Sequence, residues 1–482
     1  MSKSIKNSSL YLFQIAISGV LMLILMPIIS KYLLPNELGV FVLTQVYASI
    51  AVGVANLGML VGYERNFFIF EKSGGESAKL ISSAVLFVTF NLLALLVLVY
   101  LFQREISDLI FTAEVPSNLL VMVLIGASTS SLSQYYLTFL KNSSMARSYI
   151  KYMIVNSIIY FMIAILLMTL AELGPMALAY AWASSNTVLF FSLFLILKKA
   201  LPIGFDMGMF RQMLKISLPL TPRVFFGFLN TQFDKILLGM IGSNSLVGVY
   251  HMGQTFAMTI FQFMTGLSRV FQPEIYRKLF AGTHAKNSNE INQYLLPFFY
   301  VSIFMALIVV LFSREFVSIF LSHEYQDATI IIIILSIYYV SMFFGKVTGT
   351  QLIYAKKTYI TTLLMFAGIT INVGLNIPFI IKWGVVGAAW ATTISGVIMT
   401  IAGYVVAQRY VKITWEWKPI LVIYSMFLIA VALSLVDYSF PMYLHVFLLL
   451  KFMCILIYII TGYVSNLMSI RKIRELLFIK DK

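Results

Sequence analysis

The chain has 482 residues, of which 60% are hydrophobic and only 11% are charged. Soluble globular proteins have about 45–50% apolar and about 25% charged residues, so this composition cannot cover a water-facing surface and excludes a soluble enzyme. The net charge of +15 would suit a nucleic acid, but a basic excess in a membrane protein reflects its topology, and we expect no nucleic-acid partner.

Fourteen apolar segments follow one another along the chain, each close to the ~20 residues that a membrane helix requires. We predict spans near 9–30, 38–61, 80–101, 117–140, 150–170, 174–197, 213–241, 246–271, 292–313, 328–350, 358–381, 384–407, 419–437 and 441–464. The first segment lacks a small-residue cleavage site and continues into further spans, so we interpret it as a retained helix. The sequence therefore predicts an all-α polytopic membrane protein.

The distribution of Lys and Arg gives the orientation of these spans. Of the 34 basic residues, 25 fall in segments on the side of the N-terminus and four on the opposite side. Basic residues collect in cytoplasmic loops, so both termini are predicted to be cytoplasmic.

Two short sequence matches indicate an internal duplication. The segment from Leu38 to Gln45 (LGVFVLTQ) resembles that from Val247 to Gln254 (VGVYHMGQ), 209 positions later, and Leu173–Ala181 resembles Trp383–Ala391 at an offset of 210. Six helices per copy is an even number, so the copies run in the same direction as a parallel repeat. We predict an N-lobe of six helices in 1–200, a C-lobe of six in 201–410, and two further helices with a basic tail in 411–482.

Several polar side chains interrupt the apolar spans at helical spacing. A charge at the bilayer centre costs about 2.5–3.5 kcal/mol even on the gentlest scale, so such residues usually face a cavity. In the seventh span Asn230 and Asp234 each fall within about 20° of Arg223 on a helix. The eighth span carries a second stripe, made of His251, Thr255, Gln262, Gly266 and Arg269.

The sign of these intramembrane charges indicates the ligand. Ser131 and Gln134 lie in the fourth span, Lys346 lies in the tenth and Arg65 ends the second. The bases inside the spans are Arg223, Lys235, Arg269, Lys346 and Lys451, whereas Asp234 is the one acid. A basic cavity suits an anionic ligand, and Arg pairs bidentately with phosphate oxygens. Lys451, away from the duplicated part, is predicted to snorkel or to line a lateral groove.

Metal and cofactor sites are not expected. Cys454 is the only cysteine, the four histidines show no paired-ligand spacing, and no phosphate-binding GxxxxGK[ST] loop occurs. Asp234 and His251 are the candidate groups for proton or ion coupling.

The combination of these features resembles a known family. The relevant motifs are Leu-Pro-Leu-x-Pro from Leu218, Asp-Lys-x-Leu-Leu-Gly from Asp234, Val-Gly-Val-Tyr from Val247 and Gly-Thr-Gln-Leu-Ile-Tyr-Ala-Lys-Lys from Gly349. Together with the 6+6+2 plan, they are similar to polysaccharide flippases, the Wzx-type O-antigen unit translocases of the multidrug/oligosaccharidyl-lipid/polysaccharide exporter superfamily. The resemblance extends over essentially the whole chain.

This resemblance implies a transporter, not an enzyme, in a bacterial cytoplasmic (inner) membrane. Its cargo would be a polyprenyl-diphosphate-linked oligosaccharide, moved to the outer leaflet by alternating access through a cationic cavity. The basic cavity residues of the family carry over to Arg223 and Arg269, and less directly to Lys346 and Arg65. Implied partners are membrane lipids and the polysaccharide polymerase and chain-length machinery.

Alternatives remain open at this point. The multidrug branch has a carboxylate in its first helix, whereas the first span here offers only Gln14 and Ser18, which disfavours a drug exporter. A peptidoglycan-precursor flippase of the same fold would also be basic. A membrane glycosyltransferase would need acidic or metal-binding residues and a larger external loop.

Overall fold

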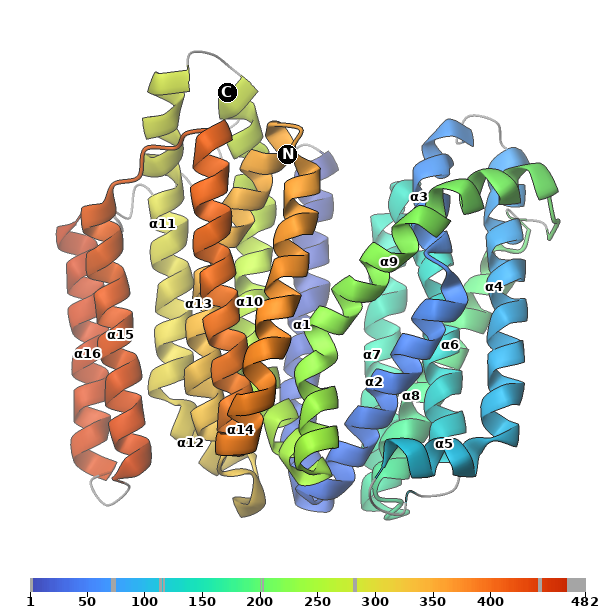
Figure 1. The fold of residues 1–482 in the computed structure, drawn as a ribbon, viewed down its shortest axis with the longest axis horizontal. Coiled ribbons are helices and arrows are strands. Elements are labelled where there is room, and N and C mark those ends of the chain that lie inside the picture. The colour runs from blue at the N-terminus through green and yellow to red at the C-terminus, as the bar shows by residue number, and fades with distance from the viewer. Residues whose placement is uncertain are drawn as a thin grey trace. The chain divides into compact units, whose positions relative to one another are not determined.

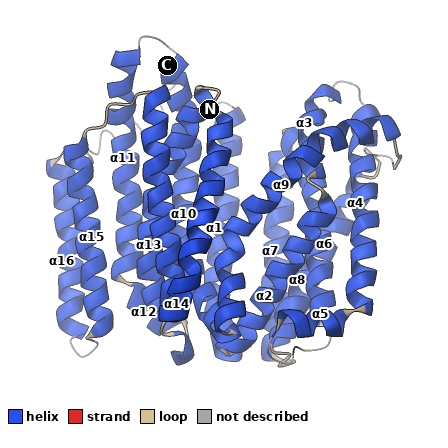
Figure 2. Cartoon of the chain, in the orientation of Figure 1, coloured by secondary structure: helices blue, strands red, loops and turns tan. Residues whose placement is uncertain are grey.

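The structure is a computed structural model that describes residues 3–70, 75–111, 115, 118–199, 201, 203–280, 284–440 and 444–465. Over these ranges the chain is helical, and no strand occurs in them (Figure 2). Backbone groups in hydrocarbon have no water to bond with, and a helix satisfies them internally. The predicted basic C-terminal tail lies outside the described residues.

The chain packs as two compact units, residues 2–248 and residues 249–482. These units are defined by packing, whereas the predicted division into 1–200, 201–410 and 411–482 is defined by sequence duplication. That division therefore stays a prediction.

The first unit contains nine helices and a short π-helical turn among its described residues. They are α1 (Lys3–Tyr32), α2 (Pro35–Asn56), α3 (Met59–Phe70), α4 (Gly75–Leu101), α5 (Gln103–Ile110), α6 (Leu119–Asn142), α7 (Ala146–Thr169), α8 (Pro175–Leu197), α9 (Met207–Leu237) and η1 (Leu238–Gly242) (Figure 1). Helix α8 packs against α6 and α7, α1 packs against α7, and α9 runs along α2 and α3. Asp206 begins α9 by accepting a hydrogen bond from the Met209 amide at 2.9 Å, which is a standard N-cap.

The second unit continues from α10, whose first turn belongs to the first unit. Its elements are α10 (Asn244–Phe280), α11 (His284–Leu311), α12 (Ser313–Phe320), the 3₁₀ turn η2 (His323–Tyr325), α13 (Ala328–Tyr354), α14 (Thr358–Tyr410), α15 (Trp417–Ser439) and α16 (Leu444–Val464) (Figure 1). Helix α13 packs against α11 and α14, and α15 packs against α11. Phe271 of α10 meets Phe298 of α11 and Phe343 of α13, with ring centroids 5.5 and 5.6 Å apart. These rings form part of the core of the unit.

Each of the fourteen predicted spans is largely helical in the described residues. Ten helices are long and apolar enough to cross a membrane, and α14, one of the ten, is 53 residues long and bends at Gly384. That bend divides α14 into the two predicted spans 358–381 and 384–407. Helices α1, α6 and α10 account for the remaining three. The expected polytopic helical fold is confirmed.

Some boundaries differ from those expected. The second predicted span, 38–61, is interrupted because α2 ends at Asn56, and Leu57 (φ 48°) and Gly58 (φ 63°) adopt left-handed conformations. Helix α3 then continues to Phe70. Helix α10 extends nine residues past the predicted end at 271, since its polar last turns remain helical.

The two sequence matches have structural counterparts. Gly174 (φ 56°, ψ −137°) precedes α8, and Gly384 (φ 56°, ψ −130°) forms the bend in α14, 210 positions later. Both backbone conformations favour glycine. Gly39 of α2 packs on the carbonyl of Asn244, and Gly248 of α10 packs reciprocally on that of Pro35. The matched glycines thus occupy equivalent places, which supports the duplication.

Candidate functional site

One face of α10 carries the predicted polar stripe. Gln262 and Arg269 are exposed on it, and His251 and Thr255 are half-buried. The Thr255 hydroxyl donates a hydrogen bond to the carbonyl oxygen of His251 at 2.7 Å, so its proton is used within α10. Gly266, expected on the same face, is buried instead. The exposed groups of the stripe are therefore the side-chain amide of Gln262 and the guanidinium of Arg269.

Arg269 and Lys346 are brought together by the packing of α10 and α13. The two cations lie close enough to interact electrostatically, and the Lys346 ammonium lies 4.6 Å from the centroid of the Phe261 ring. Among the described residues neither cation forms a salt bridge with a carboxylate. A cation over an aromatic face is stabilised by the ring quadrupole. The Phe261 ring thus lies against the Lys346 ammonium, and Arg269 adds a second positive charge within electrostatic range, which an anion would neutralise.

Phe261 was not among the residues that the sequence singled out. Its position directly before Gln262 is the only signal that sequence reasoning offered, and an aromatic residue in an apolar span is unremarkable by itself. The ring also lies 6.1 Å from that of Tyr339, which is buried on α13. This contact fixes the ring beneath the ammonium.

In the first unit the predicted site residues lie on α3, α6 and α9. Arg65, Gln134 and Asn230 are exposed, and Ser131 is half-buried. Ser131 accepts a hydrogen bond from the Asn56 side-chain amide at 2.9 Å, and the Tyr135 hydroxyl donates to the Asn56 oxygen at 2.7 Å. Asn56 and Tyr135, which sequence reasoning missed, therefore hold the polar end of α2 against α6.

Of the two neighbouring charged residues Glu64 and Arg65 on α3, only Glu64 forms an ion pair among the described residues. Lys141 forms an ion pair with Glu64 at 2.7 Å, with both side chains nearly half exposed. Such an exposed pair contributes about 0–1 kcal/mol. Arg65 projects separately from this pair as an exposed cation.

Helix α9 places its predicted residues in different environments. Arg223 lies in α9 between Pro222 and Val224, and its side chain lies outside what the structure describes. Asp234 and Lys235 are both buried and interact electrostatically, and the Lys235 ammonium donates to the Gln232 side-chain oxygen at 3.1 Å. The acid of the predicted stripe is thus packed inside the unit, one turn beyond the exposed Asn230.

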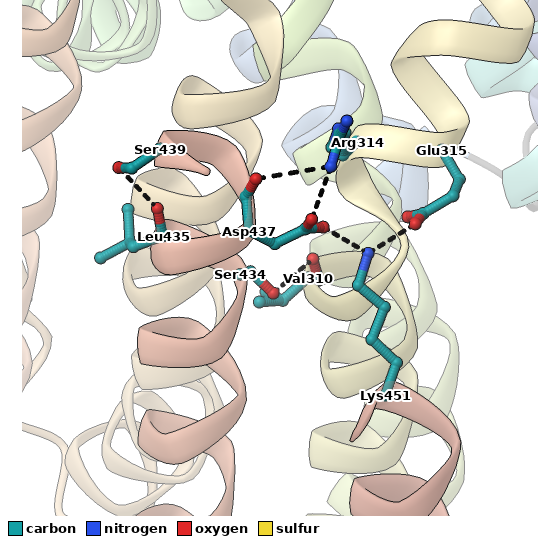
Figure 3. Close-up of polar contacts among 8 residues, drawn as sticks. All are labelled: Val310, Arg314, Glu315, Ser434, Leu435, Asp437, Ser439 and Lys451. Atoms are coloured by element: carbon teal, nitrogen blue, oxygen red, sulfur yellow. Dashed lines mark hydrogen bonds and ion pairs between the residues drawn. The ribbon is translucent and has the colours of Figure 1, made fainter. Parts of the chain in front are cut away.

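A second charged cluster joins α12, α15 and α16, and Figure 3 shows its geometry. Lys451 contacts Glu315 and Asp437 at 2.6 Å each, and Arg314 contacts Asp437 at 2.6 Å. The Lys451 and Asp437 side chains are fully or almost fully buried. Two cations and two anions cancel, which makes the burial of these charges tolerable.

This cluster corrects two expectations from the sequence. Lys451 neither snorkels nor lines a lateral groove, because it is enclosed by its two carboxylate partners. Asp234 is not the one acid of the helical segments either, since Asp437 lies in α15 and is buried. Spacing within one helix gave no hint of these pairs, because their members come from three elements. The cluster holds α12, α15 and α16 together, whereas Arg269 and Lys346 have no carboxylate partner among the described residues.

In the described ranges no group of three or more His, Cys, Asp or Glu residues is arranged to hold a metal ion. What the Arg269–Lys346 surface can do chemically is bind an anion reversibly. Phosphate and diphosphate oxygens are the ligands that such a pair prefers.

Comparison with solved structures identifies the fold. The chain is similar to the lipid II flippase MurJ in an inward closed conformation, with a TM-score of 0.74 and 18% identity over 96% of this chain and 100% of that one. It is also similar to an inward-facing multidrug resistance MATE family transporter of the MOP superfamily, with a TM-score of 0.64 and 13% identity over 82% and 94% of the two chains. At these identities the likeness establishes the fold, and the chain is a multi-pass membrane protein.

Sequence comparison identifies the family. The chain is 26% identical to the capsular polysaccharide biosynthesis protein CapF of Staphylococcus aureus over 214 residues, which are 42% of this chain and 52% of that relative. The match thus spans about half the length of the relative. Residues 28–330, well over half of the chain, match the polysaccharide biosynthesis protein family. The chain therefore belongs to the polysaccharide biosynthesis protein family, as the resemblance to polysaccharide flippases predicted.

Proposed function

We propose that this protein is a flippase that moves a polyprenyl-diphosphate-linked oligosaccharide, such as an O-antigen or other surface polysaccharide unit, across a bacterial inner membrane. The family and the fold support a flippase for a lipid-linked polysaccharide or precursor. The observation that carries the finer proposal is the Arg269–Lys346 pair, two cations within electrostatic range of each other and without a carboxylate partner among the described residues. A diphosphate supplies the missing negative charge.

In this proposal the diphosphate headgroup binds Arg269 and Lys346, and the prenyl tail stays in lipid. Gln262 on α10 would hydrogen-bond sugar hydroxyls, and Ser131, Gln134 and Asn230 of the first unit are proposed as further polar contacts for the glycan. Alternating access between the two lobes then exposes the glycan on the outer side. No covalent bond forms or breaks. Arg223 and Arg65 are proposed as further contacts for the headgroup.

Because the cargo must be released after transport, the protein must bind its diphosphate with only moderate affinity. A hydrogen bond to a charged group contributes about 1.5–3 kcal/mol, so two such contacts capture a diphosphate without trapping it. Asp234 and His251 remain the proposed groups for ion coupling. Removal of the glycan on the outer side would also drive the cycle by mass action.

The test uses a strain without this gene and without a redundant flippase, complemented with wild type, Arg269→Ala or Lys346→Ala. We expect each variant to accumulate cytoplasm-facing lipid-linked glycan and to lose surface polysaccharide, because losing one charged contact weakens binding by about tenfold or more. Arg277→Ala is the matched control on the same helix, since Arg277 is exposed and paired with Glu274 at 2.7 Å. Wild-type levels of both products in the Arg269 and Lys346 variants would refute the proposal.

The second candidate is a peptidoglycan-precursor flippase, favoured by the 0.74 TM-score to MurJ. Both cargoes carry a diphosphate, so the cation pair alone does not separate them. The same strains decide: accumulation of the peptidoglycan precursor with normal surface polysaccharide would establish this candidate. Drug export that is insensitive to either lipid would instead favour a MATE-like exporter.

A further inference from the structure

An open stripe of α13 runs past Lys346. The first turns of this helix are almost entirely buried, whereas its second half presents a row of half-buried or exposed positions, namely Tyr338, Met342, Gly345, Lys346, Gly349 and Ile353. At 100° per residue these six positions fall within an arc of about 100°. A charged side chain inside a span usually faces a water-filled cavity, so the stripe that carries Lys346 borders water and not lipid.

Two glycines flank Lys346 on this stripe. Gly345 is exposed and Gly349 is half-buried. A Cβ at either position would meet no atom within 4 Å, so neither glycine is required by the packing of the second unit. Glycine weakens a helix interior relative to alanine, and it suits a place where a ligand approaches the backbone closely. The space in front of the two glycines is therefore open to a ligand.

The first unit is filled at the matching points of the predicted duplication. Tyr135 lies 210 positions before Gly345 and is fully buried. Phe139 lies 210 positions before Gly349 and packs against Phe67, with the ring centroids 6.0 Å apart. Aromatic rings thus occupy this part of α6, whereas α13 presents bare backbone on both sides of a cation.

The groups around the two glycines suit a sugar that is joined to a phosphate. Phe261 lies against the Lys346 ammonium, and the next residue, Gln262, presents an exposed amide. Tyr338 adds a half-buried ring to the same stripe of α13. A pyranose has an apolar C–H face and a rim of hydroxyls, so a bare helix surface beside a ring and an amide is complementary to it.

We propose that Gly345 and Gly349 form the subsite for the sugar that is bonded directly to the diphosphate. The inference rests on the proposed function, in which Arg269 and Lys346 hold the diphosphate. That sugar is one glycosidic bond from the phosphate, and it lies against the α13 backbone where side-chain atoms are missing. Side-chain size at positions 345 and 349 therefore limits the glycosylated lipid and spares the bare diphosphate.

The test measures binding of two probes to the purified protein in detergent. One probe is farnesyl diphosphate, which has no sugar, and the other is lipid-linked glycan extracted from the strain without this gene. We expect Gly345→Leu and Gly349→Leu to bind the glycan about tenfold or more weakly, because the leucine fills the space of the sugar. Both variants should bind farnesyl diphosphate as wild type does.

Gly374 of α14 supplies the matched control. It is exposed, and a Cβ there would also meet no atom within 4 Å. Its neighbours on that face include Ile377 and Ile381, which are 42% and 70% exposed, so lipid covers this stripe. Gly374→Leu should bind both probes as wild type does.

Alanine variants keep the proposal testable if the leucine variants fail to fold. Gly345→Ala and Gly349→Ala should keep or raise the melting temperature, because alanine favours the helix and its methyl group meets no atom, and should weaken glycan binding severalfold. Equal weakening for both probes, or normal glycan binding with transport lost, would overturn the proposal. Normal binding of both probes by Arg269→Ala and Lys346→Ala would instead refute the proposed function on which it rests, so the two failures are distinguishable.

Discussion

The charged side chain of Lys451 is fully buried in the protein. Breaking a buried ion pair by removing one partner costs about 3–5 kcal/mol, because the other charge stays buried and unpaired. Lys451→Met should therefore lower the melting temperature of the purified protein in detergent by several degrees. Lys199→Met, at an exposed position, should leave it unchanged and serves as the control.

The cluster geometry makes this prediction sharper. Adding Glu315→Gln to Lys451→Met removes the one carboxylate that Lys451→Met leaves without a cation, and the Arg314–Asp437 pair stays intact at 2.6 Å. The double variant should recover part of the lost stability, as expected for residues in one network. A double variant less stable than Lys451→Met would contradict the network described.

At the scale of elements, α2 and α10 begin against each other with glycine on both sides of the contact. A Cβ at Gly39 would overlap the carbonyl of Asn244, and one at Gly248 would overlap that of Pro35. Gly39→Ala should destabilise the protein by about 1–3 kcal/mol, because the helices must separate to admit the methyl group. Thermal unfolding in detergent measures the change.

The same helix supplies the control. A Cβ at Gly53 of α2 meets no atom within 4 Å, so Gly53→Ala should be neutral or stabilise slightly through its helix propensity. Equal losses for Gly39→Ala and Gly53→Ala would show that helix propensity, not the close crossing, accounts for the effect.

At the scale of the whole molecule, the fourteen spans make a definite prediction of topology. In a Cys454→Ala background, single cysteines at Lys356 and Lys382, on the two sides of one predicted span, are tested with a membrane-impermeant thiol reagent on intact cells. The external position, Lys382, should react and the cytoplasmic position, Lys356, should not; both are exposed. Labelling of the cysteine at position 356 alone would show that the orientation is the reverse of the predicted one. Labelling at both positions would show that no span separates them.

The sequence alone was sufficient to predict the fold class. Apolar segments of membrane length, charges biased to one side and two sequence matches at offsets of 209 and 210 positions each depend on local composition or simple spacing. Even the polar stripe on α10 follows from helical periodicity, and Gln262 and Arg269 are exposed as that periodicity requires. The family resemblance rested on motifs of the same local kind.

Only the tertiary structure decided which charges are compensated. Asp437, Lys451 and Glu315 lie far apart in the chain, so no spacing rule predicts that they meet, and the same holds for Lys346, Arg269 and the Phe261 ring. Burial is likewise a property of neighbours: Phe90 and Tyr300 lie 210 positions apart, at an offset of the predicted duplication, yet one is 72% exposed and the other 1%. Periodicity fixes the direction in which a side chain points along its own helix, whereas the packing of other helices determines what it meets there.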